Sequence, residues 1–182
     1  MSRVEIHGYA IVSDNDRIAD ATGHTPEVLR NDADWAYFQA ELNRSDVTVL
    51  GRLGHEANPN PRNRVRIVLS SSSQGIERRV DGWWWNPQKL PWDEAIRRVL
   101  PHGGRVAVPG GRRVFDLFLG IGYDAFHLTR AEGVVVPDGI ALFSQCDSGK
   151  SAETVLSDAG LKPGMRQVLD PSLPVSLVIW HR

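Results

Sequence analysis

Two adjacent glycines and two arginines, at residues 110–113, are the part of the sequence best suited to binding an anion. They follow Arg105–Val108, a β-branched run typical of a buried strand, and precede Val114–Leu119, whose apolar residues favour a buried helix. Glycine lets a ligand approach the backbone, and a helix N-terminus offers free N–H groups. An ordinary turn with solvated arginines fits equally well. The candidate phosphate-binding residues are Gly110, Gly111, Arg112 and Arg113.

A carboxylate near the start of a predicted amphipathic helix is the second chemical candidate. Asn31 or Asp32 is a plausible N-cap for this helix. Asp34 lies four residues before Phe38, so its carboxylate borders the apolar side of the helix. Such a residue is either a solvated aspartate that suits the helix dipole or an acid held in a pocket, and the pattern alone favours the solvated alternative. The apolar stripe consists of Trp35, Phe38 and Leu42.

Two further strands end in small or hydroxyl residues close to an arginine. Val47–Leu50 is followed by Gly51 and Arg52, and Arg64–Leu69 is followed by the serine run 70–73. An α/β sheet builds phosphate sites at the carboxyl ends of its strands in this way, although two ordinary strand ends would look the same.

These candidates need a scaffold of alternating strands and helices. Helices are expected from Pro91 to Val99 and from Ala152 to Ala159. Residues 14–30 are irregular and long enough to be a functional loop. Strands alternate with helices early and cluster late, which predicts an α/β fold with a mostly parallel central sheet, an antiparallel C-terminal edge strand and helices on both faces. The remaining predicted strands are Val4–Ser13, Ala125–Arg130, a continuation at Gly133–Val136, and Val175–Trp180.

Three consecutive tryptophans, Trp83 to Trp85, form the most unusual run in the chain. In a strand, alternation would place Trp83 and Trp85 on one face and Trp84 on the other. Core packing with one exposed tryptophan is favoured over a ligand-stacking platform or a contact between subunits.

Composition narrows the class of protein. The chain has 182 residues, 41% hydrophobic and 24% charged, which predicts one globular domain spanning residues 1–182. The net charge of -1 argues against a broad nucleic-acid surface. The single Cys146 excludes an intrachain disulfide, and no histidine spacing indicates a metal site. Neither a membrane-spanning run nor a signal peptide is evident, so we expect a cytoplasmic protein.

Six segments, taken in this order, resemble the dihydrofolate reductase superfamily over roughly residues 4–145. The resemblance implies the three-layer fold of that superfamily and a reductase that uses NADPH. The matching segments are D-A-D-W-A-Y-F from Asp32, V-L-G-R-L-G-H-E from Val49, R-V-R-I-V-L-S-S from Arg64, D-E-A-I from Asp93, V-P-G-G-R-R-V-F-D-L-F-L from Val108 and H-L-T-R from His127.

The resemblance also implies roles for individual residues on the substrate side. Asp34 corresponds to the single ionisable residue of the pterin pocket, where a carboxylate can accept two hydrogen bonds from the ring. Thr129 corresponds to the hydroxyl that supports this carboxylate. Phe38 would pack on the pterin ring, and Arg64 corresponds to the arginine that binds the carboxylate of the folate tail.

On the cofactor side, the Gly110–Gly111 turn corresponds to the site of the dinucleotide pyrophosphate, with Arg112 and Arg113 beside it. A guanidinium and hydroxyls near the adenosine 2′-phosphate favour NADPH over NADH, because a dianion needs charge-assisted donors. The residues implied there are Gly51, Arg52, Ser70 and Ser71.

The chain also departs from the family pattern. Leu53, Gly54 and His55 stand where the family has x-T-W, Phe115 stands where it has tyrosine, and loop 19–29 lacks the usual Pro-Trp. The leading hypothesis is reduction of a dihydropterin, with dihydrofolate as the first candidate. Two alternatives remain open: reduction of a ribosylaminopyrimidine in riboflavin biosynthesis, and NADPH binding without catalysis. A homodimer is compatible with the tryptophan run.

Overall fold

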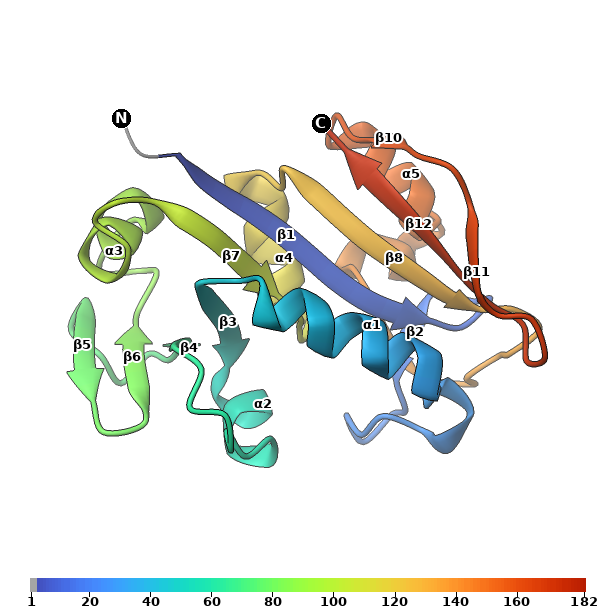
Figure 1. Ribbon diagram of the computed structural model, residues 1–182, viewed down its shortest axis with the longest axis horizontal. Helices are drawn as coiled ribbons and strands as arrows, with labels where there is room; N and C mark the ends of the chain where they lie inside the picture. Colours follow the sequence, from blue (N-terminus) through green and yellow to red (C-terminus); the bar gives the residue numbers. More distant parts are fainter. Residues whose placement is uncertain (1–2) are drawn as a thin grey trace.

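A computed structural model describes residues 3–182, which form a twisted sheet covered by helices on both faces (Figure 1). The order of strands in the main sheet is β10-β12-β8-β1-β7-β3-β4-β6-β5, and β11 also pairs with β12. Six neighbouring strands are parallel. They are β8 (Ala125–Ala131), β1 (Val4–Val12), β7 (Gly104–Val108), β3 (Val47–Gly51), β4 (Arg66–Leu69) and β6 (Gly82–Trp85).

Antiparallel strands complete the sheet at both ends. The final strand β12 (Val175–His181) runs antiparallel to β8, and β5 (Ile76–Arg79) forms a hairpin with β6. Two short strands pair with β12 in turn: β10 (Lys162–Pro163) and β11 (Gln167–Asp170). A separate ribbon pairs β2 (Arg17–Ala19) with β9 (Ile140–Ala141).

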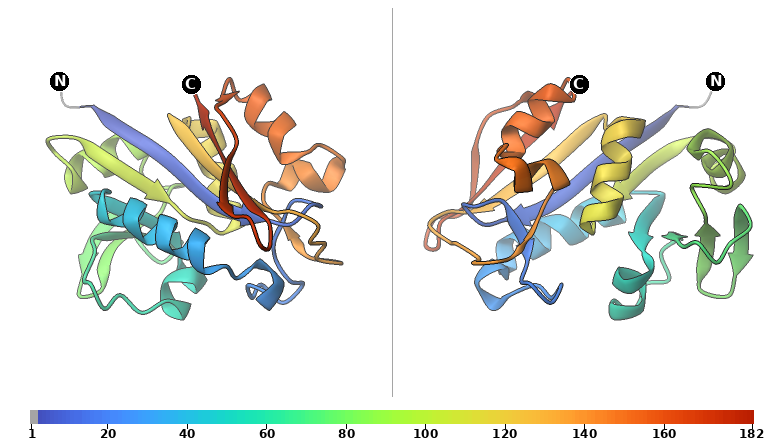
Figure 2. Two further views of the ribbon diagram at one scale, coloured as in Figure 1. Left: turned by 45° about the vertical axis from the view of Figure 1, so that its right-hand side comes forward. Right: turned by 180° about the vertical axis from the view of Figure 1, so that it is seen from behind.

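The larger core lies between the sheet and the helices of one face, where α4 and α5 cover the sheet in the rear view (Figure 2). Trp92 of α3 packs against Phe118 of α4 and Trp85 of β6. The ring centroids are 4.9 Å apart in the first pair and 5.4 Å apart in the second. Aromatic rings thus join α3, α4 and the sheet. The helices are α3 (Trp92–Val99), α4 (Arg112–Ile121) and α5 (Ala152–Asp158), with 3₁₀ turns η1 (Glu27–Leu29) and η2 (Ser144–Ser148).

Helix α1 (Asp32–Asn43) lies on the opposite face, in front of β1 and the end of β7 (Figure 1). The side chain of Asn31 caps it by accepting a hydrogen bond from the Asp34 N–H at 3.0 Å. Its apolar contact with the sheet is small, since only Tyr9, Leu42 and Ala107 form the buried cluster there, with Phe38 partly buried against them. Polar groups therefore make much of the contact between α1 and the sheet.

The predicted architecture is confirmed: six parallel strands, antiparallel β12 and helices on both faces. Two of the predicted strands are wrong in part. The fourth strand starts at Arg66 because residues 60–64 form a turn, in which Asn60 bonds the N–H and C=O of Arg64. Residues 133–136 lie in an irregular loop rather than an edge strand.

The apolar side of α1 and the tryptophan run also differ from expectation. Trp35 is 60% exposed, since the sheet-facing side of α1 carries polar residues instead. Trp83 and Trp85 do share the core face, as alternation predicts, but Trp84 is not exposed. It is covered by the Arg79 guanidinium, 4.5 Å above its ring, and its indole N–H donates to Asp81.

The remaining helix, α2 (Arg52–Ala57), follows β3 directly. None of the helices within residues 3–182 is long and apolar enough to cross a membrane.

The aromatic junction between α3, α4 and the sheet generates the first prediction. Replacing Phe118 with alanine removes a fully buried ring and should lower the free energy of unfolding by about 3–5 kcal/mol. Leu119→Ala, on the same helix but only half-buried, is the matched control and should cost clearly less. Urea denaturation measures both, and equal losses would contradict the assignment of Phe118 to the core.

Candidate active site

Three neighbouring strands bring the predicted cofactor residues to one end of the sheet. Strands β7, β3 and β4 are adjacent and parallel, and Gly51 lies opposite Leu69 in the register. Their carboxyl ends therefore meet at the same edge, as the rule for α/β sheets requires. This edge carries Gly51 and Arg52 at the junction of β3 and α2, together with the loops that contain Ser70, Ser71, Gly110 and Gly111.

The Gly110–Gly111 turn leaves backbone accessible at the start of α4. Gly110 has φ +124°, and the peptide bond between the two glycines is cis. A Cβ on Gly110 would lie 3.1 Å from the ring of Phe115, whereas nothing lies within 4 Å of a Cβ placed on Gly111. Gly111 caps α4 without a side-chain hydrogen bond, so the first N–H groups of the helix are available to an anion.

The arginines beside this turn are less free than the sequence suggests. Arg112 is bound to Asp147 at 2.8 Å, and Arg52 is bound to Glu56 at 3.0 Å. Arg113 is exposed, and no carboxylate of residues 3–182 lies within ion-pair distance of it. An anion at this edge would therefore meet one free arginine and two that already have partners.

Asp34 lies on the side of α1 that faces β8, and Thr129 of β8 lies beside it. Burial raises the pKa of the Asp34 carboxyl to about 6, and a hydrogen bond with the Thr129 side chain opposes part of that rise. Thr129 is itself buried on β8, opposite Ile11 of β1. The structure thus brings together the two residues that the resemblance paired, and the carboxyl can change protonation near neutral pH.

Phe38 lies on α1, one turn after Asp34, and Arg64 lies in the loop before β4. The ring of Phe38 is 6.0 Å from that of Tyr9 and 6.0 Å from that of Trp35. Arg64 donates to Gln39 at 3.0 Å and to Asn43 at 2.8 Å, so it lies against the last turns of the helix.

Two more arginines lie close to Arg64. Arg62 also donates to Asn43, and Arg66 donates to the imidazole of His55 and the C=O of Asn58. Within residues 3–182, no carboxylate forms an ion pair with any of these three arginines. The pKa of Arg64 is lowered by burial and by the charge of Arg62. This cluster could bind an acidic group of a ligand.

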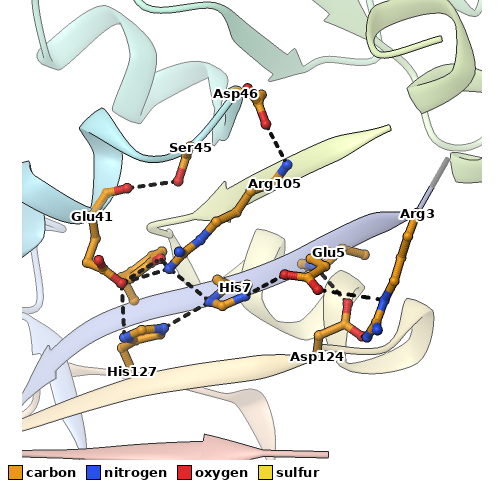
Figure 3. A network of polar contacts seen from close by, with 11 residues as sticks. Arg3, Glu5, His7, Glu41, Ser45, Asp46, Arg105, Asp124 and His127 are labelled. Atoms are coloured by element: carbon orange, nitrogen blue, oxygen red, sulfur yellow. Dashed lines mark hydrogen bonds and ion pairs between the residues drawn. The ribbon is translucent and has the colours of Figure 1, made fainter. Parts of the chain in front are cut away.

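A buried polar network beneath α1 was not predicted from the sequence (Figure 3). The carboxylate of Glu41 is buried, and the Arg105 guanidinium of β7 donates to it at 2.7 Å. The same Arg105 nitrogen donates to the Tyr9 hydroxyl at 2.7 Å and lies 3.1 Å from Nδ1 of His7. His127 of β8 lies 3.6 Å from Glu41 and 3.0 Å from His7.

A sequence signal for this network does exist. Three predicted strands carry ionisable residues on one face, at His7 and Tyr9, at Arg105 and at His127. Such residues in central strands need partners, because an unpaired buried charge is costly. The pattern predicts a buried polar cluster, although it does not identify Glu41 as the partner.

Comparison with known proteins gives matches in structure alone. No family model and no curated protein sequence matches the chain. Dihydrofolate reductase from Enterococcus faecalis, complexed with NADP(H), superposes with a TM-score of 0.68 at 17% identity, over 100% of this chain and 98% of that one. A riboflavin biosynthesis protein from Shewanella sp. PV-4 gives 0.69 at 19% identity, over 98% and 99%.

A third match is the deaminase/reductase from Thermotoga maritima, with a TM-score of 0.65 at 18% identity. The alignment covers 98% of this chain but only 56% of that protein, so this chain spans about half its length. The architecture is thus an α/β fold with a mostly parallel central sheet. More specifically, the chain has the dihydrofolate reductase-like fold, which confirms the resemblance seen in the sequence at the level of the fold.

The raised pKa of Asp34 generates a stability prediction. The folded state binds this proton more tightly than the unfolded state, so stability falls as pH rises from 3.8 to about 6 and stays lower above it. Asp34→Asn should therefore stabilise the protein at pH 7.5, by up to about 3 kcal/mol. The gain should vanish below pH 3.8. Urea unfolding at pH 7.5 and 3.5 measures it.

Asp32→Asn is the matched control, since Asp32 is an exposed aspartate of the same first helical turn. Removing its charge takes away a favourable interaction with the helix dipole and should not stabilise the protein. Equal effects of the two variants would contradict the buried position of Asp34.

The lowered pKa of His127 predicts that stability depends on pH in the opposite direction. Burial, aided by the charges of His7 and Arg105, lowers its pKa to about 3. Between pH 6.5 and about 3 the unfolded state binds more protons at this residue, so stability falls as pH falls through this window. His127→Gln stays neutral, so its urea midpoint should decline less from pH 6.5 to 4 than that of the wild type. Parallel declines would show that His127 is not held neutral.

Proposed function

We propose that the protein is an NADPH-dependent oxidoreductase that reduces a dihydropterin-type ring, with dihydrofolate reduced to tetrahydrofolate as the first candidate reaction. The observation that carries the proposal is the half-buried carboxyl of Asp34, with a pKa of about 6 and Thr129 beside it. A carboxyl in this state can exchange protons at neutral pH and hydrogen-bond to the N–H edge of a ring.

The residues at the carboxyl edge of the sheet fit a dinucleotide. The open space at Gly111 and the uncapped start of α4 suit a pyrophosphate, and Arg113 offers a free positive charge. The hydroxyls of the run 70–73, of which Ser70 and Ser72 contact each other at 2.8 Å, suit a further phosphate. The solved neighbour in complex with NADP(H) supports the choice of cofactor. When bound, NADPH supplies a hydride.

The chain's own residues then have three tasks. Phe38 would contact the flat face of the ring, and Arg64 would bind an acidic group on its substituent. Asp34 would hold the ring through its N–H groups and pass on the proton that accompanies the hydride. The proposed catalysis depends on the orientation of the substrate ring against the nicotinamide and on the raised pKa of the Asp34 carboxyl.

A second candidate is reduction of a ribosylaminopyrimidine. Two of the solved neighbours are a riboflavin biosynthesis protein and a deaminase/reductase that acts on phosphoribosylaminouracil. The cluster of Arg62, Arg64 and Arg66, which has no carboxylate partner in residues 3–182, suits a phosphate group as well as a folate carboxylate. Because of this observation, both a dihydropterin and a ribosylaminopyrimidine are assayed as substrates.

The test follows NADPH oxidation at 340 nm with dihydrofolate and with the pyrimidine substrate in parallel. Asp34→Asn should bind NADPH as the wild type does but turn over the preferred ring about 100-fold more slowly. In the wild type, kcat/KM should fall as pH rises through about 6, because the protonated carboxyl is the active form. The same profile should be flat in Asp34→Asn.

Asp32→Asn should keep the rate and profile of the wild type. Turnover of the pyrimidine alone would select the second candidate. Tight NADPH binding without turnover of either ring would instead indicate a binding protein and contradict the proposal.

A further inference from the structure

A chain of contacts leads from the surface toward the candidate active site, and its outer part, from Glu5 through His7 to His127, is drawn in Figure 3. It begins at His7, whose side chain is 14% exposed and whose Nε2 lies 3.7 Å from the carboxylate of Glu5. Nδ1 of His7 is 3.0 Å from Nε2 of His127. Nδ1 of His127 is in turn 2.5 Å from the hydroxyl of Tyr37. Two imidazoles thus connect the surface with Tyr37.

The inner end of this chain lies on the same side of α1 as Asp34. Tyr37 follows Asp34 by three residues, so the two side chains are neighbours on the same face of α1. Thr129 follows His127 by two residues on β8, so these two point to the same face of the sheet. The Tyr37–His127 pair therefore lies next to the Asp34–Thr129 pair along the same helix and strand.

Both imidazoles are held in the neutral form. The pKa of His7 is lowered by burial and by Arg105, and that of His127 is lowered in the same way. A neutral imidazole has one N–H and one free nitrogen, so it can accept a proton on one side and release another on the opposite side. A permanently charged imidazolium could not do this.

The charges around the rings compensate one another. Glu41 accepts from Arg105 at 2.7 Å and pairs with Arg44 at 3.3 Å, while it lies 3.6 Å from His127. Its carboxylate can stabilise a passing positive charge on His127, and the two arginines keep it from trapping that charge. The groups that face the two rings are Glu5, Tyr9 and Asp124 near β1 and β8, Tyr37 and Glu41 from α1, Arg105 from β7, and His181 from β12.

We propose that His7, His127 and Tyr37 form a proton path that supplies Asp34 from solvent while ligands occupy the candidate active site. The proposal rests on the proposed function to the extent that the reduction consumes a proton. One solvent proton binds Nε2 of His7, and the Nδ1 proton of His7 moves to Nε2 of His127. This step uses the tautomer of His7 with its proton on Nδ1, in which the two hydrogens of the nearby Arg105 nitrogen go to Glu41 and Tyr9. The Nδ1 proton of His127 then moves to the Tyr37 oxygen, whose own proton leaves toward Asp34. One proton enters, one leaves, and no charge accumulates.

The first experiment needs no turnover. NMR of the ¹⁵N-labelled protein measures how fast the ring N–H of His127 exchanges with solvent, the signal being assigned by its loss in His127→Gln. The path predicts that this proton exchanges faster than the backbone amide of His127, which needs local opening of β8. Equal protection of the two protons would overturn the proposal without any variant.

Two variants then test the path itself. His7→Gln can still hydrogen-bond to His127, but an amide cannot pass a proton on, so exchange at the His127 ring should slow at least tenfold. Tyr37→Phe removes only the inner end and should leave this exchange unchanged. Unchanged exchange in His7→Gln, in a variant with the circular dichroism of the wild type, would overturn the proposal.

The second experiment uses whichever ring the wild type reduces. His7→Gln and Tyr37→Phe should lower kcat at least fivefold at pH 9, where solvent protons are scarce, and much less at pH 6, with KM for NADPH unchanged. Added imidazole should restore part of the rate in His7→Gln. A loss equal at both pH values would mean that the chain only supports α1. Absence of any wild-type turnover would count against the proposed function, while the exchange measurement would still decide on the path.

Discussion

The contact of Glu41 with Arg105 determines how α1 lies on the sheet. A buried carboxylate must be compensated, and the 2.7 Å contact to Arg105, with Tyr9 and Arg44 nearby, provides that compensation. The apolar contact beneath α1 is small, so polar pairs fix the rotation and height of the helix. The position of Asp34, two turns before Glu41 on the same side, follows from this attachment.

The other half of the candidate site depends on backbone pairing instead of side chains. Strands β7, β3 and β4 are adjacent and parallel, so their turns meet at one edge regardless of the residues in them. Glu41 and Arg105 link the two halves, because α1 carries Asp34 and β7 leads into the Gly110–Gly111 turn. A single buried ion pair thus connects the proposed substrate side with the proposed cofactor side.

The sequence predicted the central strands well, because β1, β3, β7, β8 and β12 are rich in β-branched or aromatic residues. It left β5 ambiguous, because three of its four residues are charged, and it missed β10, a two-residue edge strand of Lys162 and Pro163. The N-cap Asn31 was predicted from local chemistry, whereas the exposure of Trp35 depends on distant partners. Proximity of the strand ends could be inferred from parallel pairing.

Other features of the site depend on partners far along the chain. The buried network joins four elements separated by up to about 120 residues, so no local pattern could reveal its pairings. The binding of Arg112 to Asp147, 35 residues away, was equally invisible in the sequence.

Asp147 has a consequence for how ligand binding and loop order are linked. Its two oxygens bind different arginines, Arg112 at the start of α4 and Arg17 in the β2 segment of the loop 14–30, both at 2.8 Å. An anion that binds Arg112 competes with Asp147, which is then left to Arg17 alone. The Asp147 carboxylate therefore competes with the anion for Arg112. The free energy by which it lowers anion affinity at α4 equals the free energy with which it holds the loop 14–30 against the helix. Occupancy at α4 and the shape of that loop are thus thermodynamically coupled.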